Sequence, residues 1–298
     1  MKILVAEDHV HTSRALGNLL QSWGYEAAIV HDGREALEAM RGPHAPRLAL
    51  LDWQMPGLDG IEVCRRLRQE GDQPYAYLLL LTGLGGRQEM LAGLEAGADD
   101  FLTKPFDEAE LKARLTAGQR VVALQERLRV LATRDGLTGL WNRAAVLDLL
   151  DRELARGRRQ GHAVGVLLAD VDHFKRINDT LGHLIGDEVL RQTARQLLEA
   201  LRPYDTIGRY GGEEFLVVLP GCGAAASAAL GERLCEQIEE GPMESNRLPI
   251  GVTISVGVAA REGASALKAT ALLSAADAGL YRAKADGRNR AALGLVPE

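Results

Sequence analysis

The chain has 298 residues, 46% of them hydrophobic and 26% charged, which is enough for two soluble domains that each bury a core. Its 35 basic and 41 acidic side chains give a net charge of −6, which argues against a protein that binds along a nucleic-acid backbone. The apolar runs are shorter than the roughly 18 residues of a membrane helix, and the chain opens as a strand rather than a signal peptide. With three cysteines and no CxxC pair, we expect a reduced cytoplasmic protein without membrane or nucleic-acid partners.

The first 120 residues alternate short apolar runs with helical periodicity. Five runs predict buried parallel strands, at residues 3–6, 27–30, 48–51, 77–81 and 100–102. Four helices are expected between them, at residues 13–23, 33–41, 61–69 and 87–96. This alternation predicts a doubly wound α/β domain over residues 1–120, with functional residues gathered at the carboxyl ends of its strands.

A further helix starts near Asp107, and its apolar residues recur at spacings of three, four and seven to about residue 134. The pattern favours a continuous linking helix over residues 107–134 with a coiled-coil tendency. The alternative is a helix that packs only on its own domain. Because no proline or Gly-Ser tract interrupts it, we expect a stiff connection that can transmit a rotation.

Residues 135–298 mix helices and strands in a different order. Helical patterns occur at residues 144–158, 184–201, 224–239 and 266–285. Strand patterns occur at residues 164–169, 206–209, 215–219 and 252–258. A Gly-Gly pair between the second and third strand patterns reads as a hairpin turn. We therefore expect a second, α+β domain with a mainly antiparallel sheet.

Charged and polar side chains follow the strands of the first domain. Glu7 and Asp8 follow the first strand, Asp52 the third, Thr82 the fourth and Lys104 the fifth. Since these strand ends meet at one edge, three carboxylates share a small space and need a cation, for which Mg²⁺ is suited. Asp52 can then act as the nucleophile that forms an aspartyl phosphate, while Lys104 neutralises the phosphoryl group.

The order and spacing of this set resemble the receiver domain of bacterial response regulators. The resemblance is carried by Glu7-Asp8, residues 52–60 (DWQMPGLDG), Thr82 and residues 101–106 (FLTKPF). It implies that Asp52 accepts phosphate from a histidine kinase or a small phosphodonor. It also implies a set of Mg²⁺ ligands, namely Asp8, Asp52 and the carbonyl of Gln54, with Glu7 nearby. The implied switch residues are Thr82, Phe101 and Lys104.

The second domain resembles the GGDEF diguanylate cyclases over nearly its whole length. Five segments carry the resemblance: residues 135–143 (DGLTGLWNR), 170–179 (DVDHFKRIND), 182–187 (GHLIGD), 209–215 (RYGGEEF) and 284–289 (KADGRN). The resemblance implies that two GTP molecules are condensed into cyclic di-GMP and two pyrophosphates. This reaction depends on positioning and charge neutralisation, since the 3′-hydroxyl of one GTP attacks the α-phosphorus of the other.

Metal-assisted attack requires carboxylates that face one another. Asp170 ends a strand pattern and Glu213 lies at the hairpin, so adjacent antiparallel strands are expected to bring these two together. By resemblance, Mg²⁺ is held by Asp170, Glu213 and the carbonyl of Val171. The implied catalytic residues are Asp170, Glu213 and Glu214. The glycines that let the backbone approach the phosphates are Gly211 and Gly212.

The remaining matched positions imply contacts to the nucleotide. Asn178 and Asp187 map to guanine-reading positions, where an amide and a carboxylate would leave polar groups unpaired against adenine. Lys284 and Arg288 map to triphosphate contacts, and His183 lies near that pocket.

A second site for the product is implied by Arg202 and Asp205, an RxxD pattern separated from Gly211 by five residues. Arg233 on the following helix commonly completes this inhibitory site in the family, and arginine suits phosphate oxygens. Because one cyclase domain holds one GTP, the resemblance also implies a homodimer.

Three alternatives remain open at this point. The second domain can be a non-catalytic module that binds GTP or cyclic di-GMP, although its intact motifs argue against this. The chain can be a DNA-binding response regulator, but no basic recognition helix is apparent. The product can also be a different cyclic dinucleotide.

Overall fold

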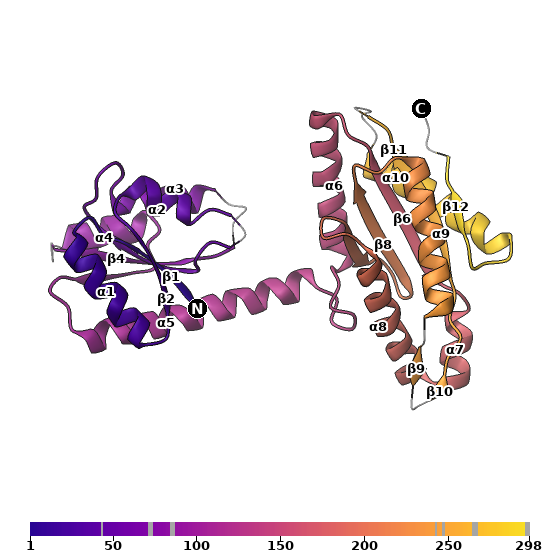
Figure 1. Cartoon of the computed structure of the whole chain (residues 1–298), viewed down its shortest axis with the longest axis horizontal. Helices are drawn as coiled ribbons and strands as arrows, with labels where there is room; N and C mark the ends of the chain where they lie inside the picture. The colour runs from indigo at the N-terminus through magenta and orange to yellow at the C-terminus, as the bar shows by residue number, and fades with distance from the viewer. Residues whose placement is uncertain are drawn as a thin grey trace. The chain divides into compact units, whose positions relative to one another are not determined.

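The computed structural model in Figure 1 describes residues 1–42, 44–70, 74–83, 87–241, 243–245, 248–263 and 268–295. The chain divides into two compact units, Met1–Val130 and Leu131–Glu298. Helix α5 (Glu108–Thr133) begins in the first unit and ends in the second. No helix in the described part of the chain is long and apolar enough to cross a membrane.

The first unit is a parallel five-stranded sheet in the order β2-β1-β3-β4-β5. Its strands are β1 (Lys2–Ala6), β2 (Glu26–Val30), β3 (Leu48–Asp52), β4 (Tyr77–Thr82) and β5 (Asp100–Thr103). Its other helices are α1 (Val10–Ser22), α2 (Gly33–Ala39), α3 (Gly60–Gln69) and α4 (Arg87–Glu95). The predicted doubly wound α/β fold is confirmed.

Both faces of this sheet are covered, which explains its nearly continuous apolar strands. Alternate strand residues enter two separate cores, so Ile3 and Val5 pack with α1 and α5 while Leu4 and Ala6 pack with α2 and α3. β3 and β4 are buried along their whole length. Their carboxyl ends are therefore held rigidly at one edge of the sheet.

The second unit is a mixed sheet in the order β12-β11-β6-β8-β7. Its strands are β6 (Val164–Val171), β7 (Thr206–Arg209), β8 (Glu214–Pro220), β11 (Ile254–Arg261) and β12 (Ala291–Leu293). Its helices are α6 (Arg143–Gln160), α7 (Phe174–Leu181), α8 (His183–Ala200), α9 (Ala224–Glu240) and α10 (Ala269–Ala285). Three strand pairs are antiparallel and only β11–β12 is parallel, which confirms the predicted α+β domain.

The pattern of the sequence did not reveal every element of this unit. It missed α7, β12 and a two-stranded ribbon formed by β9 (Glu244–Ser245) and β10 (Leu248–Pro249). Residues 266 and 267, the first of the helix expected at 266–285, lie outside the described residues.

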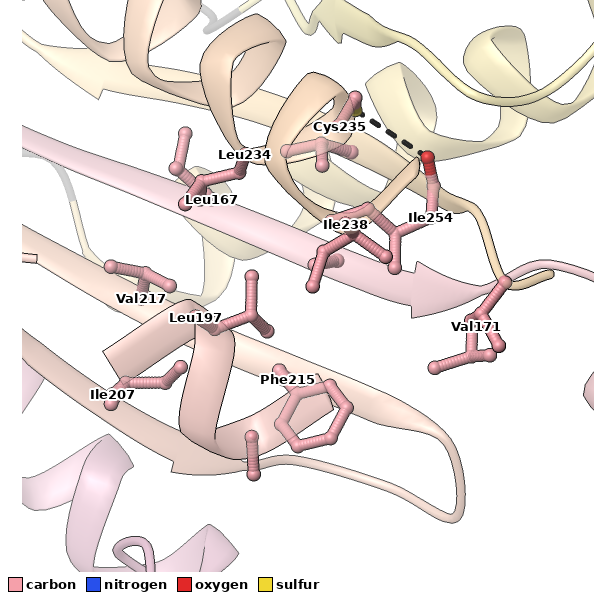
Figure 2. Close-up of a cluster of buried hydrophobic side chains, with 14 of the residues drawn as sticks. Leu167, Val171, Leu197, Ile207, Phe215, Val217, Leu234, Cys235, Ile238 and Ile254 are labelled. Carbon is pink, nitrogen blue, oxygen red and sulfur yellow. Dashed lines mark hydrogen bonds between the residues drawn. The ribbon is translucent and has the colours of Figure 1, made fainter. Parts of the chain in front are cut away.

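The second sheet also has a core on each face. Figure 2 shows the larger one, where Phe215, Leu167 and Ile254 of the sheet meet Leu197 of α8 and Leu234 of α9. On the opposite face α6 and α10 pack against alternate residues of β6 and β8. The sandwich fixes the ends of β6 and β8, where the acidic motifs lie.

Candidate functional sites

The predicted acidic residues of the first unit meet in one cavity of about 370 Å³ at the carboxyl edge of the sheet. Its lining includes Glu7, Asp8, Asp52, Thr82 and Lys104. Asp52 and Thr82 are the last residues of β3 and β4, Lys104 follows β5, and the Glu7-Asp8 pair follows β1. The structure thus brings together the five side chains that the sequence placed at this edge.

Lys104 lies between two carboxylates of this cavity. Its Nζ donates to Glu7 Oε2 at 2.6 Å and to Asp52 Oδ2 at 2.9 Å. Glu7 is only 1% exposed, and burial raises its pKa against the opposing effect of the Lys104 hydrogen bond. Burial would lower the pKa of Lys104, but the hydrogen bonds to Asp52 and Glu7 outweigh it, so that pKa is raised. The ammonium therefore stays charged beside Asp52.

The other predicted receiver residues occupy two environments. Gln54 lines the same cavity, together with Trp53. Phe101 is half-buried on β5, where the guanidinium of Arg114 lies 5.8 Å from its ring centroid. Thr82 is buried at the end of β4. β4 and β5 pair in parallel, so Thr82 and Phe101 lie on neighbouring strands.

In the second unit, β6 and β8 bring two carboxylates face to face. Their antiparallel register pairs Asp170 with Glu214, and side chains directly opposite each other project to the same face. Glu213, which the sequence analysis placed opposite Asp170, comes one residue earlier. Its carbonyl accepts the N–H of Val171 at 3.3 Å. The register of β6 and β8 thus places Glu214, and not Glu213, directly opposite Asp170.

The surroundings of Asp170 and Glu214 disfavour the ionised form of both carboxyl groups. Burial raises the pKa of Asp170, and Lys284 offsets part of the effect because its Nζ lies 2.8 Å from Asp170 Oδ2. Burial also raises the pKa of Glu214, and the nearby charge of Asp170 adds to it. One buried and one half-buried carboxylate with a single lysine contact favour a further cation.

The two hairpin glycines have different roles. A Cβ on Gly211 would lie 2.3 Å from Glu214 Oε2, so a side chain there would displace that carboxylate from its position. A Cβ on Gly212 would meet no described atom within 4 Å. Arg209 donates to the carbonyl of Gly212 through Nε at 3.0 Å and Nη2 at 2.6 Å. Gly212 thus faces open space and leaves the hairpin accessible to a ligand.

The predicted base-reading residues lie at the junction of α7 and α8. Asn178 Oδ1 is buried and has no hydrogen-bond partner among the described residues. A Cβ on Gly186 would lie 1.9 Å from that oxygen, so glycine lets the amide approach α8. Asp187 is half-buried one residue further along, and His183 is exposed at the start of α8. An unpaired buried amide oxygen is suited to a polar ligand.

The predicted inhibitory residues gather around the turn between α8 and β7. Asp205 Oδ2 accepts the N–H of Arg202 at 2.9 Å, and its Oδ1 is buried without a partner in the described chain. Arg233 Nη2 donates to the carbonyl of Ala200 at 3.3 Å, which brings α9 close to this turn. Arg202 itself is exposed, so it is available to an anionic ligand.

The comparisons with known proteins decide the family. Residues 132–290 match the family described as "Diguanylate cyclase, GGDEF domain", and residues 3–116 match "Response regulator receiver domain". The chain belongs to the GGDEF family of diguanylate cyclases. Its first unit is a receiver domain and its second a GGDEF domain.

Two curated relatives match long stretches of this GGDEF protein. Response regulator PleD of Caulobacter vibrioides is 34% identical over 297 residues, which cover 97% of this chain and 64% of PleD. Diguanylate cyclase DgcP of Pseudomonas aeruginosa is 41% identical over 212 residues, which cover 67% of this chain and 31% of DgcP. The chain therefore spans less than two thirds of the length of these curated relatives.

Solved structures support the fold of the GGDEF unit. The coiled coil and GGDEF domain of DgcB from Caulobacter crescentus, in complex with c-di-GMP, superposes with a TM-score of 0.58 and 33% identity. The match covers 63% of this chain and 98% of the DgcB chain.

Receiver and GGDEF domains use divalent metal ions, and the residues of both sites fit one. In the receiver, Glu7, Asp8 and His9 each offer a ligand atom within 4.8 Å of the others. In the GGDEF unit, Asp170 and Glu214 lie directly opposite each other on the neighbouring strands β6 and β8. Oxygen donors of this kind are those that Mg²⁺ prefers.

The structure also reveals residues to which the sequence analysis gave no role. Asp172 is buried directly after β6, and Asp135 forms an ion pair with Arg209 at 3.3 Å. The signal for Asp172 was an acidic residue next to a strand that is otherwise apolar. Its partners are more than 80 residues away in sequence, so the pattern could not identify them.

Proposed function

We propose that this chain is a diguanylate cyclase that condenses two GTP into cyclic di-GMP and two pyrophosphates under the control of phosphorylation at Asp52. The observation that supports it best is the cluster of Asp170, Glu214 and Lys284 beside the open Gly211-Gly212 hairpin. A carboxylate for a metal, a second carboxylate for the hydroxyl proton, a lysine for phosphate and glycines for backbone approach are the groups that this phosphoryl transfer needs.

In the proposed reaction the guanine base binds between α7 and α8. The amide of Asn178 and the carboxylate of Asp187 read its polar edge, and the buried Oδ1 of Asn178 gains a partner. Lys284 and Arg288 bind the triphosphate, and Lys284 can exchange its contact with Asp170 for one with phosphate oxygens. His183 borders the nucleotide from the exposed start of α8.

The chemical step occurs twice, once from each GTP: a 3′-oxygen forms a bond to the α-phosphorus of the other nucleotide, and the bond from that phosphorus to pyrophosphate breaks. Glu214 accepts the proton of the 3′-hydroxyl, a role that its raised pKa favours. Asp170, Glu213 and the Val171 carbonyl would hold Mg²⁺. The bound ion supplies positive charge that acidifies the hydroxyl and neutralises phosphate oxygens.

In the receiver, Asp52 is the proposed nucleophile toward a histidine kinase or a small phosphodonor. Asp8, Asp52 and the Gln54 carbonyl would hold Mg²⁺, with Glu7 close by. Lys104, already 2.9 Å from Asp52, is placed to contact the phosphoryl oxygens. Thr82 and Phe101 would then respond to the new charge.

The product requires two GGDEF domains that face each other, so a homodimer is part of the proposal. Three leucines of α5, Leu124, Leu128 and Leu131, recur at spacings of four and three and are 57%, 60% and 77% exposed. This spacing is that of the a and d positions of a coiled coil. We expect the same stripe of a second copy to cover it.

A route for regulation leads from the end of α5 to the catalytic hairpin within the second unit. Asn142 contacts the last turn of α5, since its N–H donates to the carbonyl of Thr133 at 2.8 Å. The N–H of Arg209 donates to the carbonyl of Trp141 at 2.8 Å, and its guanidinium joins Asp135 to Gly212. A change at the helix end can thus reach Gly212 through few contacts.

Product inhibition is proposed at Arg202, Asp205 and Arg233. Arg202→Ala removes a guanidinium that suits the phosphates of cyclic di-GMP. Added cyclic di-GMP should then inhibit the variant at least about tenfold more weakly, which corresponds to one lost charge-assisted hydrogen bond. Unchanged inhibition would contradict this assignment.

The cyclase activity is tested by incubating the purified chain with GTP and Mg²⁺ and separating the nucleotides by chromatography. We expect cyclic di-GMP from the wild type and none above background from Glu214→Gln, which keeps the shape of the side chain. GTP binding without any product would instead support a non-catalytic binding module.

A further inference from the structure

Asp172 is a buried carboxylate of the GGDEF unit that the proposed reaction does not use. It is 4% exposed and follows β6, two residues after Asp170. Ser255 Oγ donates to its Oδ1 at 2.7 Å, and Thr253 Oγ1 donates to its Oδ2 at 2.8 Å. A buried carboxylate is destabilising unless hydrogen-bond donors surround it, and these two hydroxyls provide such donors to Asp172.

The third donor to Asp172 comes from a turn after α10. The backbone N–H of Asn289 donates to Asp172 Oδ2 at 3.1 Å, and Arg288 Nε lies 4.0 Å from Asp172 Oδ1. At the other end of the turn, the N–H of Arg288 donates to the carbonyl of Ala283 at 2.9 Å. The Asp172 carboxylate thus accepts a backbone hydrogen bond from this turn and lies close to the guanidinium of Arg288.

The turn has an unusual backbone. Gly287, Arg288 and Asn289 have φ values of 113°, 66° and 50°, so two consecutive residues with side chains are left-handed. Such residues avoid this region unless surrounding contacts hold them there. Asp172 provides contacts to both of them.

From this geometry we propose that Asp172 is a positioning residue that fixes the left-handed turn and thereby aims Arg288 at the triphosphate of GTP. The inference rests on the proposed function, because that function assigns Arg288 to the triphosphate. Lys284, four residues before Arg288, lies with its Nζ 2.8 Å from Asp170 Oδ2, so the same end of α10 already reaches the acidic cluster.

Asp172 and Asp170 would then have different roles in the GGDEF unit. Asp170 is held by one movable lysine and is available to a metal ion. Asp172 has its oxygens occupied by hydroxyl and backbone donors and serves as an anchor.

The test compares two ligands that share guanine and differ in their phosphates. 3′-Deoxy-GTP lacks the attacking hydroxyl and is not turned over, and GMP lacks the terminal phosphates. By calorimetry, Asp172→Asn in the full chain should weaken 3′-deoxy-GTP binding about tenfold, the effect of one lost charged contact, and leave GMP binding unchanged. Equal weakening of both ligands, or no weakening, would overturn the proposal.

Two further variants separate positioning from general damage. In an Arg288→Ala background, Asp172→Asn should cause no additional loss of 3′-deoxy-GTP affinity, because both act through one contact. Asn289→Gly, which relieves the left-handed backbone, should restore part of the affinity lost in Asp172→Asn. Additive losses and absent rescue would contradict the role.

A variant that keeps the carboxylate guards against failure to fold. Ser255→Ala removes one donor and should weaken 3′-deoxy-GTP by about threefold without affecting GMP. If the wild type binds 3′-deoxy-GTP more tightly than GMP but forms no cyclic di-GMP, the proposed function fails and the positioning role stands. If the wild type binds both ligands equally, the role of Arg288 and this inference fail together.

Discussion

The acidic site of the receiver and the acidic site of the GGDEF unit contain the same kinds of side chain in different arrangements. Each sets carboxylates at strand ends and contacts them with a lysine from a distant segment. Lys104 bridges two carboxylates, Glu7 at 2.6 Å and Asp52 at 2.9 Å. Lys284 contacts one carboxylate, Asp170, at 2.8 Å.

The difference follows from the two sheets. In the receiver, parallel strands converge at one edge, and the lysine directly follows a strand within that edge. In the GGDEF unit, two antiparallel neighbours pair their acidic residues, and the lysine comes from the last turn of α10. The first arrangement suits a phosphoryl group that stays covalently bound to the protein, and the second suits a substrate that must enter and leave.

The largest expected effect is a loss of cyclase activity that leaves phosphorylation of the receiver unchanged. Asp170→Asn and Glu214→Gln should each lower cyclic di-GMP formation at least about a hundredfold, because charge stabilisation in the transition state is lost. Phosphate uptake at Asp52 from labelled acetyl phosphate should be unaffected. Loss of that phosphorylation would show that the two sites are not independent.

Substitution of Lys284 and of Lys104 should change different kinetic quantities. Lys284→Met should reduce kcat/KM for GTP by about tenfold to a hundredfold, the worth of a charged phosphate contact. Lys104→Met should instead reduce the ratio of rates with and without a phosphoryl mimic to one. The initial rates of both variants, measured with and without beryllofluoride, check this, and an equal loss of kcat/KM in both would contradict the comparison.

The pH dependence should reflect the buried pair in the GGDEF unit. The pKa values of Asp170 and Glu214 are raised, so protonation should reduce activity at a higher pH than for exposed carboxylates. A raised carboxyl pKa means stability that is present below the unfolded pKa and lost as pH rises through the folded one. Asp170→Asn should therefore raise the melting temperature at neutral pH, and the gain should vanish in acid.

That stability profile has a built-in control. Asp148, which is exposed and pairs with Arg152 on α6, should show no such gain when changed to Asn. Melting curves of the three proteins from acid to neutral pH compare them directly. A gain for Asp170→Asn that is equally large in acid would contradict the role of charge burial.

The smallest expected effect concerns base selection. In Gly186→Ala, the new methyl group should displace the amide of Asn178, whose oxygen would otherwise lie 1.9 Å away. The end of this side chain can rotate, so the melting temperature should change little while GTP binding weakens relative to ATP. Competition binding with the two nucleotides measures this, and an unchanged preference would remove Asn178 from base recognition.

The sequence was informative where one strong period repeats. Alternating apolar runs predicted the parallel sheet, and therefore the meeting of Glu7, Asp52 and Lys104 at its edge. The motif around Gly211 predicted the hairpin. These features depend on local pattern and on the topology that the pattern implies.

Features set by tertiary contacts were out of reach. The register that pairs Asp170 with Glu214 depends on how β6 and β8, which are distant in sequence, align in the sheet, and the motif does not specify this. The anchor at Asp172 depends on Thr253, Ser255 and Asn289, which only the folded sheet and the turn after α10 bring to it. Helix α7 has only eight residues, so its apolar positions Phe174, Ile177 and Leu181, at spacings of three and four, give just two turns of helical period.

The central claim is that the receiver controls the cyclase through Asp52. The most direct measurement is the initial rate of cyclic di-GMP formation from GTP and Mg²⁺, with and without beryllofluoride, in the wild type and in Asp52→Asn. The account predicts a higher rate with beryllofluoride in the wild type and no increase in Asp52→Asn. An equal increase in both proteins, or a wild type that forms product without any response, would contradict it.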